Sequence, residues 1–283
     1  MTSPIASPRD IVVFVEEEEG RMGRLSFAAT LAAAWDAHLI ATFVANRMDL
    51  NPCNGFAHGS GLTAMLRRHH AAVRDAADRT REVFEDLARR HSISSEWRLS
   101  DGESEEALML HARHASLAIV GPPARPAKTM RTLSLSEDVI FASGRPTLLL
   151  PTDWPSDRIG RRIVVGWNGS REATTAIASA MPFLVGAEGV HLVVVPEAGA
   201  RGLLGADPGA DISRHLARHG VPVVLEQRDG RDAGRVLLDR ARDLDADMLV
   251  MGAYGRSKIR EFVFGGATRA VLAGAEFPIL LSR

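Results

Sequence analysis

The residues best suited to chemistry form a glycine-rich segment near the end of the sequence. Gly252, Gly255 and Gly265 follow one another with two and nine residues between them. An apolar run, residues 247–252, precedes the segment, and residues 267–275 follow it with apolar residues at helical spacing. Glycine permits positive φ and lets a ligand approach the backbone closely. Taken alone, the pattern fits two structures: an ordinary turn after the strand, or a phosphate-binding loop between the strand and the next helix.

The helix after this loop is expected to begin near Gly265. The free N–H groups of Gly266, Ala267 and Thr268 would then point into the crevice at the end of the strand. A helix N-terminus attracts anions, and Arg256 adds positive charge nearby.

Other reactive residue types do not form a comparable set. His215 and His219 have the spacing of metal ligands on a helix, but arginines flank them and no third ligand is evident. Ser170 follows Gly169, but the sequence is not Gly-x-Ser-x-Gly, so Ser170 is interpreted as a helix N-cap. Because no residues pair a nucleophile with a base, the sequence gives little support for an enzyme.

The composition excludes several classes of protein. Among 283 residues, 46% are hydrophobic and the formal net charge is −1, so no global field attracts nucleic acid or an anionic membrane. Cys53 is the single cysteine, which excludes an internal disulfide. Since neither a membrane-spanning run nor a signal peptide is evident, a cytoplasmic protein is expected.

The chain repeats itself. Three pairs of segments match in order: 10–15 with 162–167, 101–121 with 229–252, and 139–151 with 271–283. The sequence therefore predicts two tandem domains, residues 1–152 and 153–283, with a turn-rich linker at 151–162. The first half carries roughly twenty extra residues, most simply around 46–75.

Each half alternates short apolar runs with helical patterns. Continuous runs of Val, Ile and Leu are typical of strands buried on both faces of a parallel sheet. Residues 64–91 have the pattern of one long helix with a charged surface. The predicted fold class is α/β, with two tandem doubly wound parallel-sheet domains, whose ligands bind beyond the carboxyl ends of the strands.

The glycine spacing resembles a known signature. Gly252-x2-Gly255-x9-Gly265 is similar to the Gly-x2-Gly-x9-Gly-(Ser/Thr) motif of the universal stress protein family. The tandem plan resembles that family's two-domain members, so the resemblance covers nearly the whole chain. It implies the adenine-nucleotide-hydrolase-like fold, with five parallel strands per domain, and final strands at 146–151 and 277–282 that pair with each other. The alternative fold is another adenine-nucleotide-binding α/β protein, which would lack the duplication.

The resemblance also implies a site. Many members of the family bind ATP, and members with a degraded signature do not. Transferred by position, the loop backbone meets the phosphates, Asn168 takes the place of the acidic residue at the adenosine end, and Val195 lies beside adenine. The implied ATP contacts, in the second domain only, are Asn168, Gly169, Val195, Gly252, Gly255, Arg256, Gly265, Gly266, Ala267 and Thr268.

The chain departs from the family pattern in three places. Gly266 stands where binding members carry Ser or Thr, and Thr268 is the candidate to replace that hydroxyl. Asn168 replaces an aspartate and so loses a charge. In the first half, residues 121–138 contain prolines instead of the second glycine, and Glu16 opens an acidic run at 16–19 that would repel polyphosphate. The first domain is therefore predicted to be a degenerate site.

Two functions remain open from the sequence. The first is a stress-response module that binds one adenine nucleotide in the second domain. The second is a pseudo-symmetric scaffold that binds no nucleotide and acts through protein contacts. The sequence leaves the protein partners unknown and a homodimer open.

Overall fold

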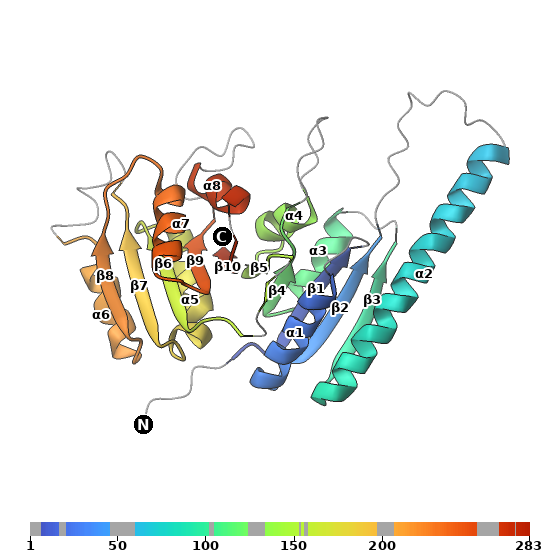
Figure 1. The fold of residues 1–283 in the computed structure, drawn as a ribbon, viewed down its shortest axis with the longest axis horizontal. Coiled ribbons are helices and arrows are strands. Elements are labelled where there is room, and N and C mark those ends of the chain that lie inside the picture. The colour runs from blue at the N-terminus through green and yellow to red at the C-terminus, as the bar shows by residue number, and fades with distance from the viewer. Residues whose placement is uncertain are drawn as a thin grey trace.

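A computed structural model describes residues 7–16, 21–45, 60–101, 105–123, 134–152, 154–155, 158–196, 207–253, 266–274 and 276–283. Within them lie ten strands and eight helices (Figure 1). The strands are β1 Asp10–Glu16, β2 His38–Val44, β3 Ser95–Ser100, β4 Leu117–Val120, β5 Thr147–Leu149, β6 Arg162–Trp167, β7 Gly189–Val194, β8 Val223–Gln227, β9 Met248–Gly252 and β10 Ile279–Ser282. The helices are α1 Arg21–Trp35, α2 Ser60–His91, α3 Glu105–Arg113, α4 Leu135–Ala142, α5 Arg171–Leu184, α6 Ala210–Arg218, α7 Ala233–Asp243 and α8 Gly266–Gly274.

The ten strands form one sheet in the order β3-β2-β1-β4-β5-β10-β9-β6-β7-β8. Neighbouring strands within each half are parallel, whereas β5 and β10 pair antiparallel, with Leu148 opposite Leu280. The pairing of the two final strands, which the family resemblance implied, is therefore confirmed. The α/β fold class is confirmed as well. Because the sheet runs through both halves, the domain boundary at residue 152 stays a prediction.

The strands are apolar because helices cover both faces of the sheet. Along β1, Ile11 and Val13 belong to one core cluster and Val12 and Phe14 to the other. The first cluster includes side chains of α1, α2, α5 and α6, and the second those of α3, α4, α7 and α8. Helix α1 also contacts α5 across the two halves, where the Trp35 and Phe183 ring centroids are 4.8 Å apart.

The predicted long helix is α2, which begins at Ser60, slightly before the predicted start at residue 64. It has 32 residues, against 9 in α6, the helix at the same place in the second half. In Figure 1 the first turns of α2 extend past the end of β3. Helix α2 thus contains part of the extra length of the first half.

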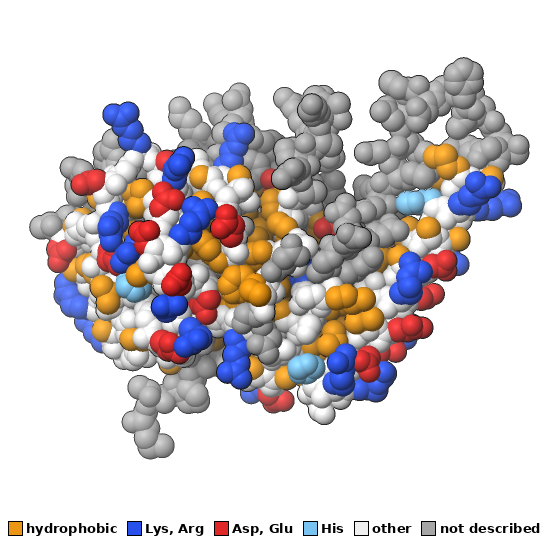
Figure 2. Space-filling model, viewed as in Figure 1, with side chains coloured by type: hydrophobic (Ala, Val, Ile, Leu, Met, Phe, Trp, Pro, Cys, Tyr) orange, Lys and Arg blue, Asp and Glu red, His pale blue; other side chains and the backbone are white. Residues whose placement is uncertain are grey.

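The surface carries charges of both signs. On the face drawn in Figure 2, acidic and basic side chains are intermixed over the second half. Among the described residues, the helices are too short or too polar to cross a membrane.

Candidate functional site

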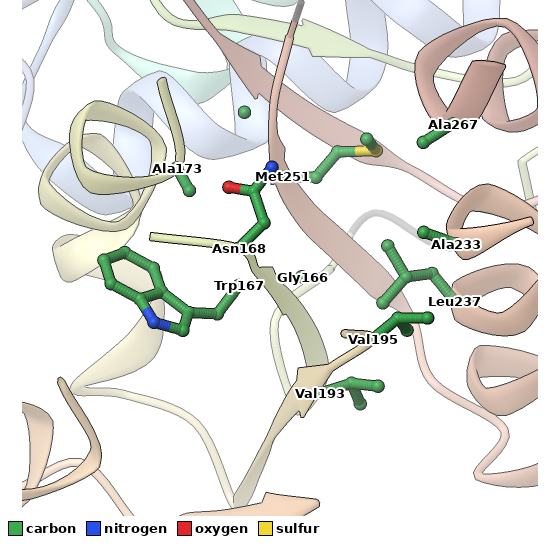
Figure 3. A pocket seen from close by; sticks show the side chains of 11 residues that line it. Gly166, Trp167, Asn168, Ala173, Val193, Val195, Ala233, Leu237, Met251 and Ala267 are labelled. Carbon is green, nitrogen blue, oxygen red and sulfur yellow. The ribbon is translucent and has the colours of Figure 1, made fainter. Parts of the chain in front are cut away.

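A cleft opens in the second half where the strand order reverses. Strand β6 has β7 on one side and β9 on the other, so the chain leaves their carboxyl ends in opposite directions. Such switch points are the usual ligand sites of open α/β sheets. The cleft is lined by Gly166, Trp167, Asn168, Ala173, Val193, Val195, Ala233, Leu237, Met251, Gly252 and Ala267 (Figure 3).

The wall of the cleft is mainly apolar. In Figure 3, Asn168 lies between Ala173 and Met251, and Val195 and Leu237 face it from the other side. The cavity volume is about 50 Å³, with about 420 Å³ of empty space when the part open to solvent is included. A small apolar surface with few polar groups suits a flat aromatic ring.

Asn168 is held by the start of helix α5. Its Oδ1 accepts a hydrogen bond from the backbone N–H of Ser170, with an N···O distance of 3.1 Å. Ser170 is the N-cap of α5, because its Oγ accepts from the N–H of Ala173 at 3.1 Å, as the sequence predicted. Gly169 between them has a φ of +70°, a conformation that favours glycine. The turn therefore fixes the Asn168 side chain at the cleft.

Gly252 lies on the cleft for a different reason than the sequence analysis gave. Its φ is not positive; a Cβ there would instead overlap the backbone N of Ala173 and lie 2.5 Å from the carbonyl carbon of Glu172. Gly252 is thus required because β9 and the first turn of α5 are in close contact. That close packing, rather than a left-handed turn, explains the glycine at this position.

The other edge of the cleft is the start of α8. This helix begins at Gly266, next to the predicted start, and Ala267 lines the cleft. A Cβ on Gly266 would meet nothing within 4 Å, so the position is open. Gly234 of α7 packs directly against the backbone of Ala267, which sets the position of α8.

Thr268 lies away from the cleft. It is 2% exposed, and its polar side chain is engaged rather than free. Its counterpart in the first half is Ser136, when the final helices are aligned on Val139 and Val271. Ser136 Oγ donates a hydrogen bond of 2.7 Å to the carbonyl of Gly121. By this symmetry, the Thr268 hydroxyl corresponds to a hydroxyl with a structural role in the first half.

The structure therefore brings Asn168, Val195, Gly252 and Ala267 to one cleft, with Gly169 and Gly266 beside it. Gly255, Arg256 and Gly265 lie outside the described residues. The sequence analysis missed the apolar contributors, among them Trp167, Ala233 and Leu237. Their signal was available in part, because Trp167 and Ala233 stand at the end of a strand and the start of a helix.

The matching helix end in the first half is already occupied. Ser134, which aligns with Gly266, is the N-cap of α4 in a capping box with Glu137. The Glu137 carboxylate accepts from the Ser134 N–H at 2.8 Å and from its Oγ at 2.9 Å. A carboxylate of the protein thus takes the donors that a bound anion would need.

A charged cluster lies on β7, β8 and α7, two of which, β7 and α7, also contribute residues to the cleft. The Glu226 carboxylate accepts two hydrogen bonds of 2.8 Å from Arg240, two from Arg228, and contacts His191 Nδ1 at 2.7 Å. Burial would raise the pKa of Glu226, but the hydrogen bonds from Arg240, Arg228 and His191 outweigh burial and lower it to about 2.

The fold and the cleft define a doubly wound α/β protein with an open cleft at its switch point. Residues 160–283 match the sequence profile of the universal stress protein family. The second half therefore belongs to the universal stress protein family, which confirms the resemblance of the glycine motif. No curated protein matches the chain in sequence.

Solved structures extend the likeness to the whole chain. A universal stress protein from Archaeoglobus fulgidus DSM 4304 is 18% identical with a TM-score of 0.71, over 99% of this chain and 97% of that one. A functionally unknown protein from Pseudomonas aeruginosa PAO1 is 18% identical with a TM-score of 0.61, over 98% of this chain and 93% of that one. At this identity the likeness establishes the fold of both halves.

Proposed function

We propose that the protein is a stress-response module that binds one adenine nucleotide, of the ATP type, in its second half. The observation that carries the proposal is the cleft at the switch point. It unites Asn168, Val195, Gly252 and Ala267, four residues that the family resemblance assigns to a nucleotide.

Different parts of the cleft suit different parts of the nucleotide. Val195 and Leu237 offer an apolar surface to the adenine ring, and Asn168 offers an amide to the ribose. The first turn of α8 reaches the cleft at Ala267, so its N–H groups and the positive end of its dipole favour the phosphates.

The first half is proposed to bind none. Its final helix has its N-terminal donors capped by Ser134 and Glu137. One nucleotide per chain is the expected stoichiometry.

Titration calorimetry of the full chain with ATP tests the proposal. We expect one site per chain, abolished by Ala233→Trp, because the indole would fill the cleft that Ala233 lines. Arg214→Trp is the control, since Arg214 is an exposed side chain on α6, which covers the opposite face of the sheet. Equal binding by both variants would show that the nucleotide does not use this cleft.

A second candidate function is a scaffold that acts through protein contacts. It is favoured by the cavity volume of about 50 Å³, well below the roughly 300 Å³ at which small-molecule pockets begin. It also agrees with the absent hydroxyl at Gly266. If neither the wild-type protein nor Gly266→Ser binds ATP at millimolar concentration, the scaffold function is supported.

A further inference from the structure

The crevice of the first half contains an arginine of the chain itself. Arg24 on α1 sends its guanidinium to the carboxyl ends of β1 and β4, which are neighbours in the sheet. Its Nη1 donates a hydrogen bond of 2.8 Å to the carbonyl of Phe14 on β1. Its head also presses on Gly121, the residue that follows β4, so that a Cβ at Gly121 would overlap it.

The second half has no such side chain at this place. When the two halves are aligned on β1 and β6, with Ile11 opposite Ile163, Ala176 takes the position of Arg24 in the sequence. Gly252, the counterpart of Gly121, packs on the backbone of α5 instead of on a guanidinium. The place that forms an open cleft in the second half is therefore filled by Arg24 in the first half.

The guanidinium is held by one carbonyl acceptor and by the charge of a nearby carboxylate. Besides the Phe14 carbonyl, Glu16 at the end of β1 attracts the charge of Arg24. Burial lowers the pKa of Arg24 and the Glu16 charge partly opposes this. Within the described part of the chain, Arg24 Nε is buried without a hydrogen-bond partner. A charge kept here despite that cost needs a site that fits it.

We propose that the first half contains a guanidinium-binding crevice whose permanent ligand is Arg24. The ligand class is an alkylguanidinium, which donates to the Phe14 carbonyl, packs against Gly121 and is attracted by the negative charge of Glu16. The crevice at the switch point is thus occupied from within. This inference stands on contacts of the first half and does not depend on nucleotide binding by the second.

Chemical rescue tests the proposal. Arg24→Ala removes the ligand but keeps the acceptors, and Arg24 is partly exposed, so a small molecule has a route into the space. We expect the Tm of Arg24→Ala to fall by several degrees. Ethylguanidinium at about 20 mM, far below the molar concentrations that unfold proteins, should restore most of that loss.

Matched controls test whether the planar guanidinium group is recognised, rather than its charge alone. Ethylammonium carries the same charge without the planar donors and should restore little. Arg24→Met fills the crevice with an apolar chain and should not respond to ethylguanidinium. If Arg24→Ala does not fold alone, its yield on refolding with ethylguanidinium is the readout, and no gain overturns the proposal. An equal Tm response of wild type, Arg24→Met and Arg24→Ala also overturns it.

Gly121→Ala supplies an independent test. The three nearest atoms to a Cβ at Gly121 all belong to the Arg24 guanidinium, and the φ of Gly121 is not positive. If Arg24 is a bound ligand, Gly121→Ala should lower the Tm of wild type by displacing it and have little effect in the Arg24→Ala background. Equal effects in both backgrounds would show that Arg24 merely lies against Gly121.

Discussion

The amide oxygen of Asn168 accepts a hydrogen bond of 3.1 Å from the backbone N–H of Ser170, which folds the side chain over the first turn of α5. Asn168→Asp keeps this acceptor and adds a charge that favours hydroxyl donors and the helix N-terminus. We expect unchanged folding and an adenosine affinity about 2- to 12-fold higher, the value of one hydrogen bond. Calorimetric titration with adenosine measures it. Equal affinities of wild type, Asn168→Asp and Asn168→Ala would remove Asn168 from the site.

Gly266→Ser restores the hydroxyl that the family signature carries. Because a Cβ at Gly266 meets nothing within 4 Å, the side chain fits without displacing a neighbour. We expect the same free energy of unfolding and an ATP affinity higher by one hydrogen bond to a charged group, about 10- to 150-fold. ATP titration is the measurement, with adenosine as the control ligand, whose affinity should not change. A gain for adenosine as large as for ATP would contradict a phosphate contact.

Thr268 provides a contrast with Gly266. The residue is 2% exposed, and its first-half counterpart Ser136 bonds the carbonyl of Gly121. In the absence of nucleotide, Thr268→Ala should therefore lower the free energy of unfolding by about 1–3 kcal/mol. Thr268→Ser keeps the hydroxyl and should keep most of the stability. Urea unfolding of both variants gives the answer. A loss of ATP affinity in Thr268→Ala with unchanged stability would instead support the phosphate contact that the sequence suggested.

The Glu226 cluster makes stability depend on pH. The pKa of Glu226 is about 2 in the folded protein, below its ordinary value of 4.5. A lowered carboxyl pKa stabilises the fold above pH 4.5, and this stability is lost as the pH falls from 4.5 through 2. The contribution is at most about 3 kcal/mol.

Urea unfolding between pH 7 and pH 2.5 tests this linkage. Glu226→Gln should be less stable than wild type at pH 7, and the difference should shrink on acidification. Glu188→Gln is the matched control, because Glu188 also pairs with an arginine, Arg161 at 2.8 Å, but on the exposed surface. It should follow the wild-type pH profile. A pH-independent difference between Glu226→Gln and wild type would exclude the linkage.

Much of the fold follows from the sequence because burial on both faces leaves a plain signal. The runs around Val12 and Val250 are apolar throughout since helices cover each side of the sheet. The internal repeat predicted where the final strands lie. These strands pair as the resemblance implied, with Leu148 opposite Leu280. A helix also follows the glycine-rich segment as predicted, since α8 covers Gly266–Gly274.

The site was less predictable, because packing rather than local pattern decides it. Gly252 is a glycine on account of the α5 backbone, a contact between segments about eighty residues apart. Arg24 lies in the first turn of α1, and nothing in the neighbouring sequence indicates that its guanidinium reaches Phe14 and Gly121. Such contacts depend on how helix and sheet meet in space, and sequence periodicity does not report that.

Gly234→Ala tests whether the position of α8 matters for the cleft. Alanine favours a helix over glycine by about 1 kcal/mol, so local propensity alone would stabilise α7. A Cβ on Gly234 would, however, overlap the carbonyl oxygen of Ala267 and lie 2.8 Å from its Cα. Helix α8 must then move away, and we expect a net loss of about 1–3 kcal/mol in the free energy of unfolding.

The shift should also weaken ATP binding, because Ala267 lines the cleft and the first turn of α8 moves with it. Gly189→Ala is the control: its Cβ would meet nothing within 4 Å, and its stability should stay within about 0.5 kcal/mol of wild type. Urea unfolding and ATP titration of the two variants give both numbers. A Gly234→Ala protein that is more stable than wild type would show that α7 and α8 tolerate a wider spacing. Unchanged ATP affinity in a destabilised variant would show that the start of α8 contributes nothing to the nucleotide.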